Sequence, residues 1–86
     1  MIIVDRPIWH AHDRRWSHLC SDTSFDELHA FAAELGLPAR AFHRDHYDLP
    51  DVRFDQAVAA GATVVSATEL VRALRAAGLR RPRRRH

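Results

Sequence analysis

Hydrophobic positions along the chain form short unbroken runs and longer stripes with helical spacing. The run Ile2-Ile-Val4, closed by Asp5, predicts a short buried strand over residues 1–5. Similar apolar segments predict extended structure at residues 39–42 and 63–66. Residues 6–23 contain Pro7 and have no clean period, so a long loop is expected there.

Three helices are expected between and after these strands. The segments Ser24-Phe-Asp-Glu27 and Ser66-Ala-Thr-Glu69 match the capping box that begins many helices. A further helix is expected from Pro50 to Gly61. The first helix carries an apolar stripe made of Phe25, Leu28, Phe31, Ala32 and Leu35. We expect this stripe to pack on the sheet with Ile3, Val64 and Leu74.

The order of these elements is strand, helix, strand, helix, strand, helix. Such alternation is typical of parallel sheets with right-handed crossovers. The sequence therefore predicts a small β-α-β-α-β-α domain with a short, mainly parallel, three-stranded sheet. We expect this single α/β domain to span residues 1–79, and residues 80–86 to form a basic, disordered tail.

The positive charge is concentrated at the C-terminus. The chain has 13 arginines and no lysine, against 11 acidic residues. Residues 1–79 hold eight arginines and all 11 acids, so they carry a charge of about −3. The other five arginines are Arg80, Arg81, Arg83, Arg84 and Arg85. A basic tail of this kind suits nucleic-acid phosphates or an acidic partner.

Composition also narrows the class of protein. The single cysteine, Cys20, excludes an intrachain disulfide and a cysteine-rich zinc site. No apolar stretch in the sequence is long enough for a signal-peptide core or a membrane span. A soluble cytoplasmic protein without membrane contact is expected. A chain of 86 residues buries only a thin core, so a homodimer would help to stabilise it.

Polar residues with catalytic or ligand-binding chemistry follow the expected strands. In parallel sheets, ligands bind beyond the carboxyl ends of the strands. We expect that edge to collect Asp5 and residues of the two loops, with His18, His46 and Asp48 close together in space. Asp22 and Tyr47 are further candidates for ligand binding at the same edge.

The chemistry of these side chains fits two ligand classes. Imidazole and carboxylate groups suit a divalent metal, and helix N-termini beside them suit a phosphate-bearing ligand. If the site is catalytic, hydrolysis fits best. Asp5, His46 and Asp48 would then hold a metal or orient water, and His18 would transfer the proton. The alternative is a non-catalytic interaction or nucleic-acid-binding module, in which the same polar residues stabilise loops and the arginine tail binds a nucleic acid or an acidic partner.

Several segments, in order along the chain, resemble one protein family. They are Trp16-Ser-His18-Leu19, Asp22, Glu27-Leu-His29-Ala-Phe31-Ala, Leu35-Gly36, His46-Tyr47-Asp48, Arg53, Ala57-Val58, Gly61-Ala62 and Glu69-Leu70. On these residues the chain resembles the bacterial and phage family called domain of unknown function 4031. The resemblance implies a small cytosolic domain of about this length. It does not point to any particular activity.

The family pattern also draws attention to particular side chains. Its polar motif positions correspond to His18, Asp22, His29, His46, Tyr47 and Asp48. This chain departs from it at Ala41-Phe42-His43, where members often carry Trp-Phe-Gln, so the resemblance does not extend to His43. The arginine tail also lies outside the family pattern.

Overall fold

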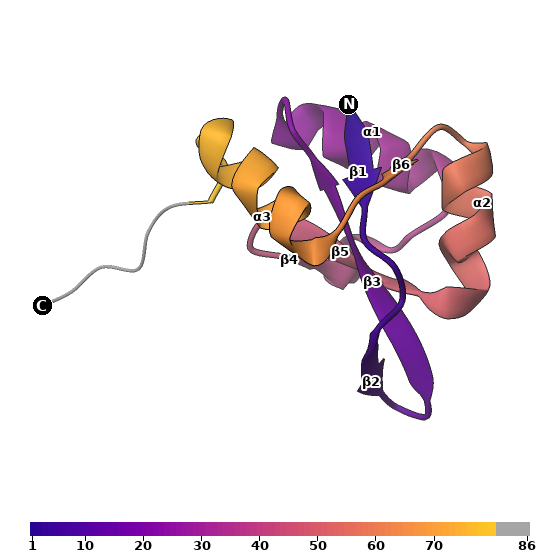
Figure 1. Cartoon of the computed structure of the whole chain (residues 1–86). Coiled ribbons are helices and arrows are strands. Elements are labelled where there is room, and N and C mark those ends of the chain that lie inside the picture. The colour runs from indigo at the N-terminus through magenta and orange to yellow at the C-terminus, as the bar shows by residue number, and fades with distance from the viewer. Residues whose placement is uncertain (81–86) are drawn as a thin grey trace, which may run out of the picture.

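The computed structural model describes residues 1–80, which form a mixed α/β domain (Figure 1). Its strands are β1 (Ile2–Val4), β2 (Trp9–Ala11), β3 (Arg14–Ser21), β4 (Phe42–His43), β5 (His46–Pro50) and β6 (Thr63–Val64). Its helices are α1 (Phe25–Glu34), α2 (Phe54–Ala59) and α3 (Ala67–Ala76), with short 3₁₀ turns at Ala39–Ala41 and Asp51–Arg53. No helix within residues 1–80 has the length and apolar character to cross a membrane.

The sheet differs from the one that the sequence predicts. It has six strands in the order β4-β5-β3-β1-β6, and β2 pairs with β3 outside this path. Within residues 1–80, only the pair β1 and β6 is parallel, while the other pairs are antiparallel. The prediction of a three-stranded, mainly parallel sheet is therefore wrong, although the α/β class and the three helices are found.

The expected loop at residues 6–23 contains the longest strand of the sheet. β2 and β3 form a hairpin whose two-residue turn is His12-Asp13, with φ angles of 52° and 62°. Two consecutive positive φ values are typical of a type I′ turn, which usually carries Asn-Gly. Histidine and aspartate also tolerate this conformation better than most residues. Without a glycine to mark it, the hairpin left no clear turn signal in the sequence.

The polar run from His43 to Asp48 is likewise a hairpin. His43 pairs with His46, and Arg44 adopts a positive φ of 63° at the turn. β5 then continues to Pro50 beside β3. Upstream, residues 39–41 form a 3₁₀ turn in place of the expected extended segment, so that β4 begins only at Phe42.

The helix starts agree closely with the capping signals. Ser66 and Glu69 form a complete capping box at α3. At α1 only half of the box is present, because Ser24 Oγ accepts from the Glu27 amide while the Glu27 carboxylate accepts from Ser21 Oγ at 2.6 Å. The second helix begins at Phe54, later than expected, after the 3₁₀ turn.

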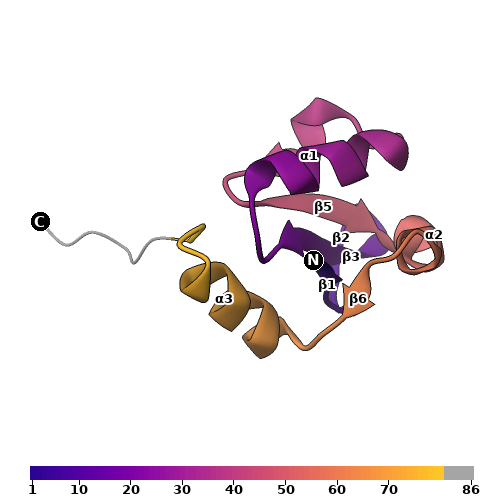
Figure 2. The same ribbon diagram turned by 90° about the horizontal axis from the view of Figure 1, so that it is seen from above.

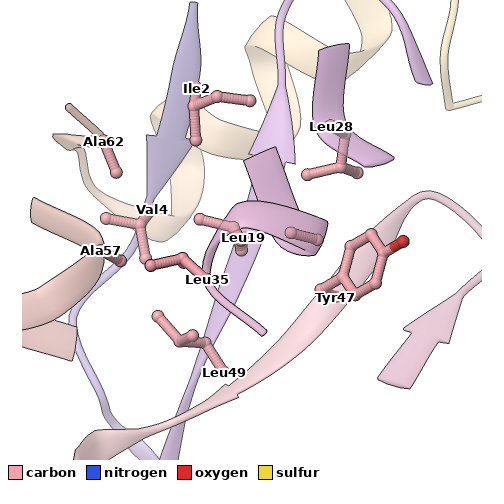
Figure 3. Close-up of a cluster of buried hydrophobic side chains, with 10 residues drawn as sticks. Ile2, Val4, Leu19, Leu28, Leu35, Tyr47, Leu49, Ala57 and Ala62 are labelled. Carbon is pink, nitrogen blue, oxygen red and sulfur yellow. The ribbon is translucent and has the colours of Figure 1, made fainter. Parts of the chain in front are cut away.

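The sheet separates two apolar clusters, with α1 and α3 on opposite sides (Figure 2). The larger cluster includes Ile2, Val4 and Leu19, which pack with Leu28 of α1 (Figure 3). Ile3 faces the other way and packs with Cys20, Leu70 and Leu74. The α1 stripe therefore does not pack on Ile3 and Leu74, because alternate residues of β1 point to opposite faces.

The end of the described chain is anchored to the domain. Arg80 donates two hydrogen bonds to Asp45, from Nε at 2.8 Å and from Nη2 at 3.0 Å. Arg80 was expected to belong to a disordered tail, and this bidentate contact corrects that expectation. The remaining tail arginines, Arg81, Arg83, Arg84 and Arg85, lie outside the described residues.

Candidate functional site

Asp5 and His18 form the centre of a polar cluster on the α3 side of the sheet. Val4 pairs with Leu19 in the antiparallel β1–β3 ladder, so the residue that follows β1 comes to lie beside His18. Asp5 Oδ1 accepts from the His18 backbone amide at 2.6 Å, and Asp5 Oδ2 lies 2.8 Å from His18 Nδ1. The Asp5 side chain is only 2% exposed, so its orientation is fixed by these two bonds.

The surroundings of His18 favour its protonated form. The hydrogen bond to Asp5 raises the pKa of His18 above its ordinary value, and this effect outweighs the opposing effect of burial. Trp9 stacks on the imidazole with ring centroids 5.0 Å apart. The side chain remains 34% exposed, and Nε2 has no hydrogen-bond partner within residues 1–80. His18 thus presents one oriented ring nitrogen to solvent.

His46 and Asp48 adjoin His18 because β5 pairs with β3. His18 and Asp48 are directly opposite in the antiparallel ladder, and His46 lies two residues along on the same face. The His18 and His46 rings meet edge to face at 5.0 Å. His46 Nδ1 lies 2.8 Å from Asp45 Oδ1, and His46 Nε2 lies 3.1 Å from Asp48 Oδ1. Both nitrogens of His46 therefore face carboxylates.

Asp45 and Arg80 complete the cluster, and the sequence analysis did not select them as a pair. Burial opposes ionisation of Asp45, but the hydrogen bonds from Arg80 and His46 outweigh it and hold its pKa below the usual value. The same contact raises the pKa of Arg80. Asp45 belongs to the polar run from His43 to Asp48, which the sequence marks as a candidate site. No sequence signal distinguishes Arg80 from the arginines that follow it.

The structure brings together four of the six candidate residues, namely Asp5, His18, His46 and Asp48. The expected reason was wrong. His18, His46 and Asp48 gather on one face of the antiparallel strands β3 and β5, and Asp5 joins them from the end of β1. Figure 1 shows β3 running through the middle of the sheet, between β1 and β5.

Tyr47 and Asp22 lie elsewhere. Tyr47 points to the opposite face of β5, where its hydroxyl is 2.7 Å from His29 Nδ1 and burial raises its pKa. Asp22 follows β3 and accepts a hydrogen bond from Thr23 Oγ1 at 2.9 Å. His29 was noted only through the family resemblance, and it belongs with Tyr47 rather than with His18.

An open cleft adjoins the polar cluster at the end of the parallel strand pair. Its volume is about 400 Å³, and it lies where β1 and β6 lead toward the N-terminus of α3. Asp5 forms part of its wall, together with the exposed side chain of Arg6. The cleft therefore shares Asp5 with the His18 cluster and places a cation near it.

Metal ligation finds little support in this geometry. Within the described residues, no group of three or more His, Cys, Asp or Glu side chains is arranged to hold a metal ion. Both oxygens of Asp5 are already bonded to His18. What the cluster offers instead is an oriented imidazole that can accept or donate a proton at Nε2.

Fold and site together define a small mixed α/β domain with an aspartate–histidine pair on one face of its sheet. The family model described as "Protein of unknown function (DUF4031)" matches residues 2–77, and the chain belongs to this family. No curated protein and no solved structure matches the chain.

Proposed function

We propose that the domain binds a phosphate-bearing ligand at His18 and catalyses its hydrolysis by proton transfer through that residue. The observation that carries the proposal is the bonding of both Asp5 oxygens to His18. A buried carboxylate that receives Nδ1–H fixes the ring and leaves Nε2 as the reactive nitrogen.

The proposed chemistry follows from this orientation. Because the contact with Asp5 favours the protonated ring, His18 acts first as a general acid. As a water oxygen attacks phosphorus, the bond from phosphorus to the leaving oxygen breaks and Nε2–H gives its proton to that oxygen. The proton lost by the attacking water then restores the imidazolium at Nε2. Asp5 stabilises this imidazolium, because its carboxylate is buried beside the ring. His46 is held by Asp45 and Asp48, so its role is to position the His18 ring edge.

The charge near the site supports an anionic ligand. Hydrogen bonding to Asp5 favours the cationic form of His18, and Arg6 adds a cation in the adjoining cleft. Asp48 opposes this effect, since its carboxylate is 37% exposed and lies on the same face. Glu69 also lines that cleft and opposes an anion there. We expect the cationic groups of His18 and Arg6 to favour a phosphate group over a neutral ligand.

The test uses chromogenic phosphate esters and the full chain. We expect turnover of p-nitrophenyl phosphate or bis(p-nitrophenyl) phosphate, lost in His18→Gln and reduced in Asp5→Asn. His10→Gln is the matched control, because His10 is exposed on the neighbouring strand. Inorganic phosphate should shift the His18 ring resonances in NMR spectra. Absence of both turnover and a phosphate-dependent shift at His18 would refute the proposal.

A divalent metal is the other ligand considered for this cluster. His46 Nε2 and Asp48 Oδ1 are close enough to share an ion, but a third donor is not arranged beside them within residues 1–80. Metal analysis of the purified chain separates the two cases. A stoichiometric metal whose removal abolishes turnover would replace the phosphate proposal with a metal-dependent one.

A non-catalytic interaction or nucleic-acid-binding module is the alternative function, with a nucleic acid or an acidic partner bound by the arginine tail. Arg80 is bonded to Asp45, so Arg81, Arg83, Arg84 and Arg85 are the main candidates for that contact. Removing residues 81–86 should then abolish partner binding and leave any hydrolysis unchanged. Loss of hydrolysis with retained partner binding would favour the catalytic function.

A further inference from the structure

The β2–β3 hairpin is a positively charged projection on an otherwise acidic domain. Figure 1 shows it extending away from the rest of the sheet. Residues 9–16 of the hairpin hold two arginines against one aspartate, whereas the rest of residues 1–79 holds six arginines against ten acids. The hairpin therefore carries a local charge opposite to that of its surroundings.

The charges of Arg14 and Arg15 are not neutralised by carboxylates. Both side chains are exposed, and neither forms an ion pair within the described residues. Arg15 Nε donates to His10 Nε2 at 3.0 Å, which holds the guanidinium across the hairpin without cancelling its charge. The backbone amide of Arg15 donates to Asp51 Oδ2 at 3.4 Å, so the Asp51 carboxylate is directed at the main chain.

Two aromatic rings share one face of the hairpin with Arg14, whereas Arg15 lies on the other face beside His10. Trp9 and Trp16 are opposite each other in the β2–β3 ladder, with centroids 5.9 Å apart. Trp16 Nε1 donates to Ala11 O at 2.9 Å, which fixes that ring across the hairpin. Both rings are only partly buried. Fixed aromatic rings beside arginines are the usual elements of surfaces that bind single-stranded nucleic acids.

A second cleft continues this surface past Trp16. It has a volume of about 390 Å³, and its lining includes Trp16 and Pro50. Arg40 and Arg53 also line it. The volume suits a single nucleobase or nucleotide. The carboxylate of Asp48 also lines the cleft and opposes phosphate, so the phosphate groups are expected nearer the arginines.

We propose that the β2–β3 hairpin and the cleft beside Trp16 form a binding surface for single-stranded nucleic acid. Arg14 and Arg15 contact the phosphates, and one base stacks on Trp16 in the cleft. This surface goes beyond the proposed hydrolysis at His18 and does not require it. It is also distinct from the tail residues 81–86, which lie outside the described residues.

The experiment measures binding of a labelled oligothymidine to the full chain by fluorescence anisotropy at several salt concentrations. Each phosphate contact contributes about 0.7 to the slope of log affinity against log salt for single strands. The double variant Arg14→Ala/Arg15→Ala should therefore lose about 1.4 from the slope. The control Arg72→Ala/Arg75→Ala removes the same charge from exposed positions on α3 and should leave the slope unchanged.

Two further measurements separate stacking from simple attraction between charges. The two tryptophans of the chain are Trp9 and Trp16, so quenching of intrinsic fluorescence by the oligonucleotide reports directly on the hairpin. The variant Arg14→Lys/Arg15→Lys should retain the salt slope of the natural chain. Circular dichroism checks that every variant is folded.

The proposal is overturned by any of four results. Equal loss in the hairpin and α3 variants would mean that only total charge matters. Unchanged affinity in the hairpin variant would place the contact elsewhere, as in the tail. Absence of tryptophan quenching would exclude stacking, and equal competition by polyglutamate or by duplex DNA would exclude recognition of a single strand.

Discussion

Asp5 and His18 are joined at two points, through the backbone amide and the imidazole of the histidine. One carboxylate thus fixes both the strand and the side chain that it carries. The contact crosses from the end of β1 to the middle of β3, and the two residues are 13 positions apart. Structural support and the proposed chemistry therefore depend on the same group.

Asp5→Asn should lower the pKa of His18 toward the value of about 6.5 found in unfolded chains, because the neutral amide stabilises the imidazolium less. The raised pKa in the natural chain stabilises the folded state below about pH 6.5, and this contribution is lost as the pH rises through the folded value. NMR titration measures the pKa, and denaturant unfolding across the same pH range measures the stability.

Asp26→Asn is the control for this substitution, since Asp26 is an exposed carboxylate on α1. It should leave the His18 titration unchanged. A His18 pKa that is the same in Asp5→Asn and in the natural chain would show that the contact does not govern ionisation of the ring.

Arg80→Gln should reduce the free energy of unfolding by about 1–3 kcal/mol at neutral pH, because it leaves the Asp45 carboxylate without its charged partner. The lowered pKa of Asp45 stabilises the fold above about pH 3.9 and this contribution disappears as the pH falls through the folded value. The difference between variant and natural chain should therefore shrink in acid.

Truncation provides an independent measure of the same contact. A chain ending at Arg80 should keep the stability of the full chain, whereas a chain ending at Leu79 should lose as much as Arg80→Gln. Thermal unfolding of the two chains is the measurement. Arg72→Gln, an exposed position on α3, should change stability by less than about 0.5 kcal/mol. Equal stability of the two truncated chains would mean that the Arg80 contact contributes nothing.

Leu28→Ala should cost about 2–5 kcal/mol, since this fully buried side chain joins α1 to the larger core. That is a large share of the 5–15 kcal/mol typical of a whole domain. Glu34→Ala on the exposed side of α1 should cost less than about 0.5 kcal/mol. Similar thermal midpoints for the two variants would contradict the packing of α1.

Asp13→Val should destabilise the β2–β3 hairpin by about 1–2 kcal/mol, because a β-branched residue fits poorly at a φ of 62°. Asp13→Gly should be neutral or stabilising by comparison, as glycine adopts this conformation without strain. Tryptophan fluorescence during denaturant unfolding follows the hairpin through Trp9 and Trp16. A valine variant as stable as the glycine variant would argue against the turn conformation.

Sequence patterns predicted the helices well because their signals are local. Ser24 and Ser66 mark the starts of α1 and α3, and the apolar spacing identifies Leu28 as buried. The strands were harder, since β3 begins with Arg14-Arg15 and includes His18, so its polarity resembles that of a loop. Its position at the centre of the sheet depends on pairing with distant segments, which no local pattern reports.

For the candidate site too, the sequence predicted the local features and not the long-range arrangement. The residue types were recognised, but the expected reason for their proximity was a parallel sheet that does not exist. Their proximity comes from the β3–β5 register, in which His18 faces Asp48. Asp45 and Arg80 were missed as partners because 35 residues separate them and the charges around Arg80 made it resemble a tail.

The single parallel strand pair has a consequence for the order of folding. Ile3 of β1 pairs with Thr63 of β6, so this contact closes a loop of about 60 residues. The turn between β2 and β3, by contrast, contains only two residues. We expect the hairpins to form early and β6 to dock late. In stopped-flow measurements, Val64→Ala should then accelerate unfolding and leave the folding rate nearly unchanged. A folding rate that falls in proportion to the lost stability would instead place β6 in the folding nucleus. During synthesis, this edge of the sheet would accordingly remain incomplete until Thr63 and Val64 had been made.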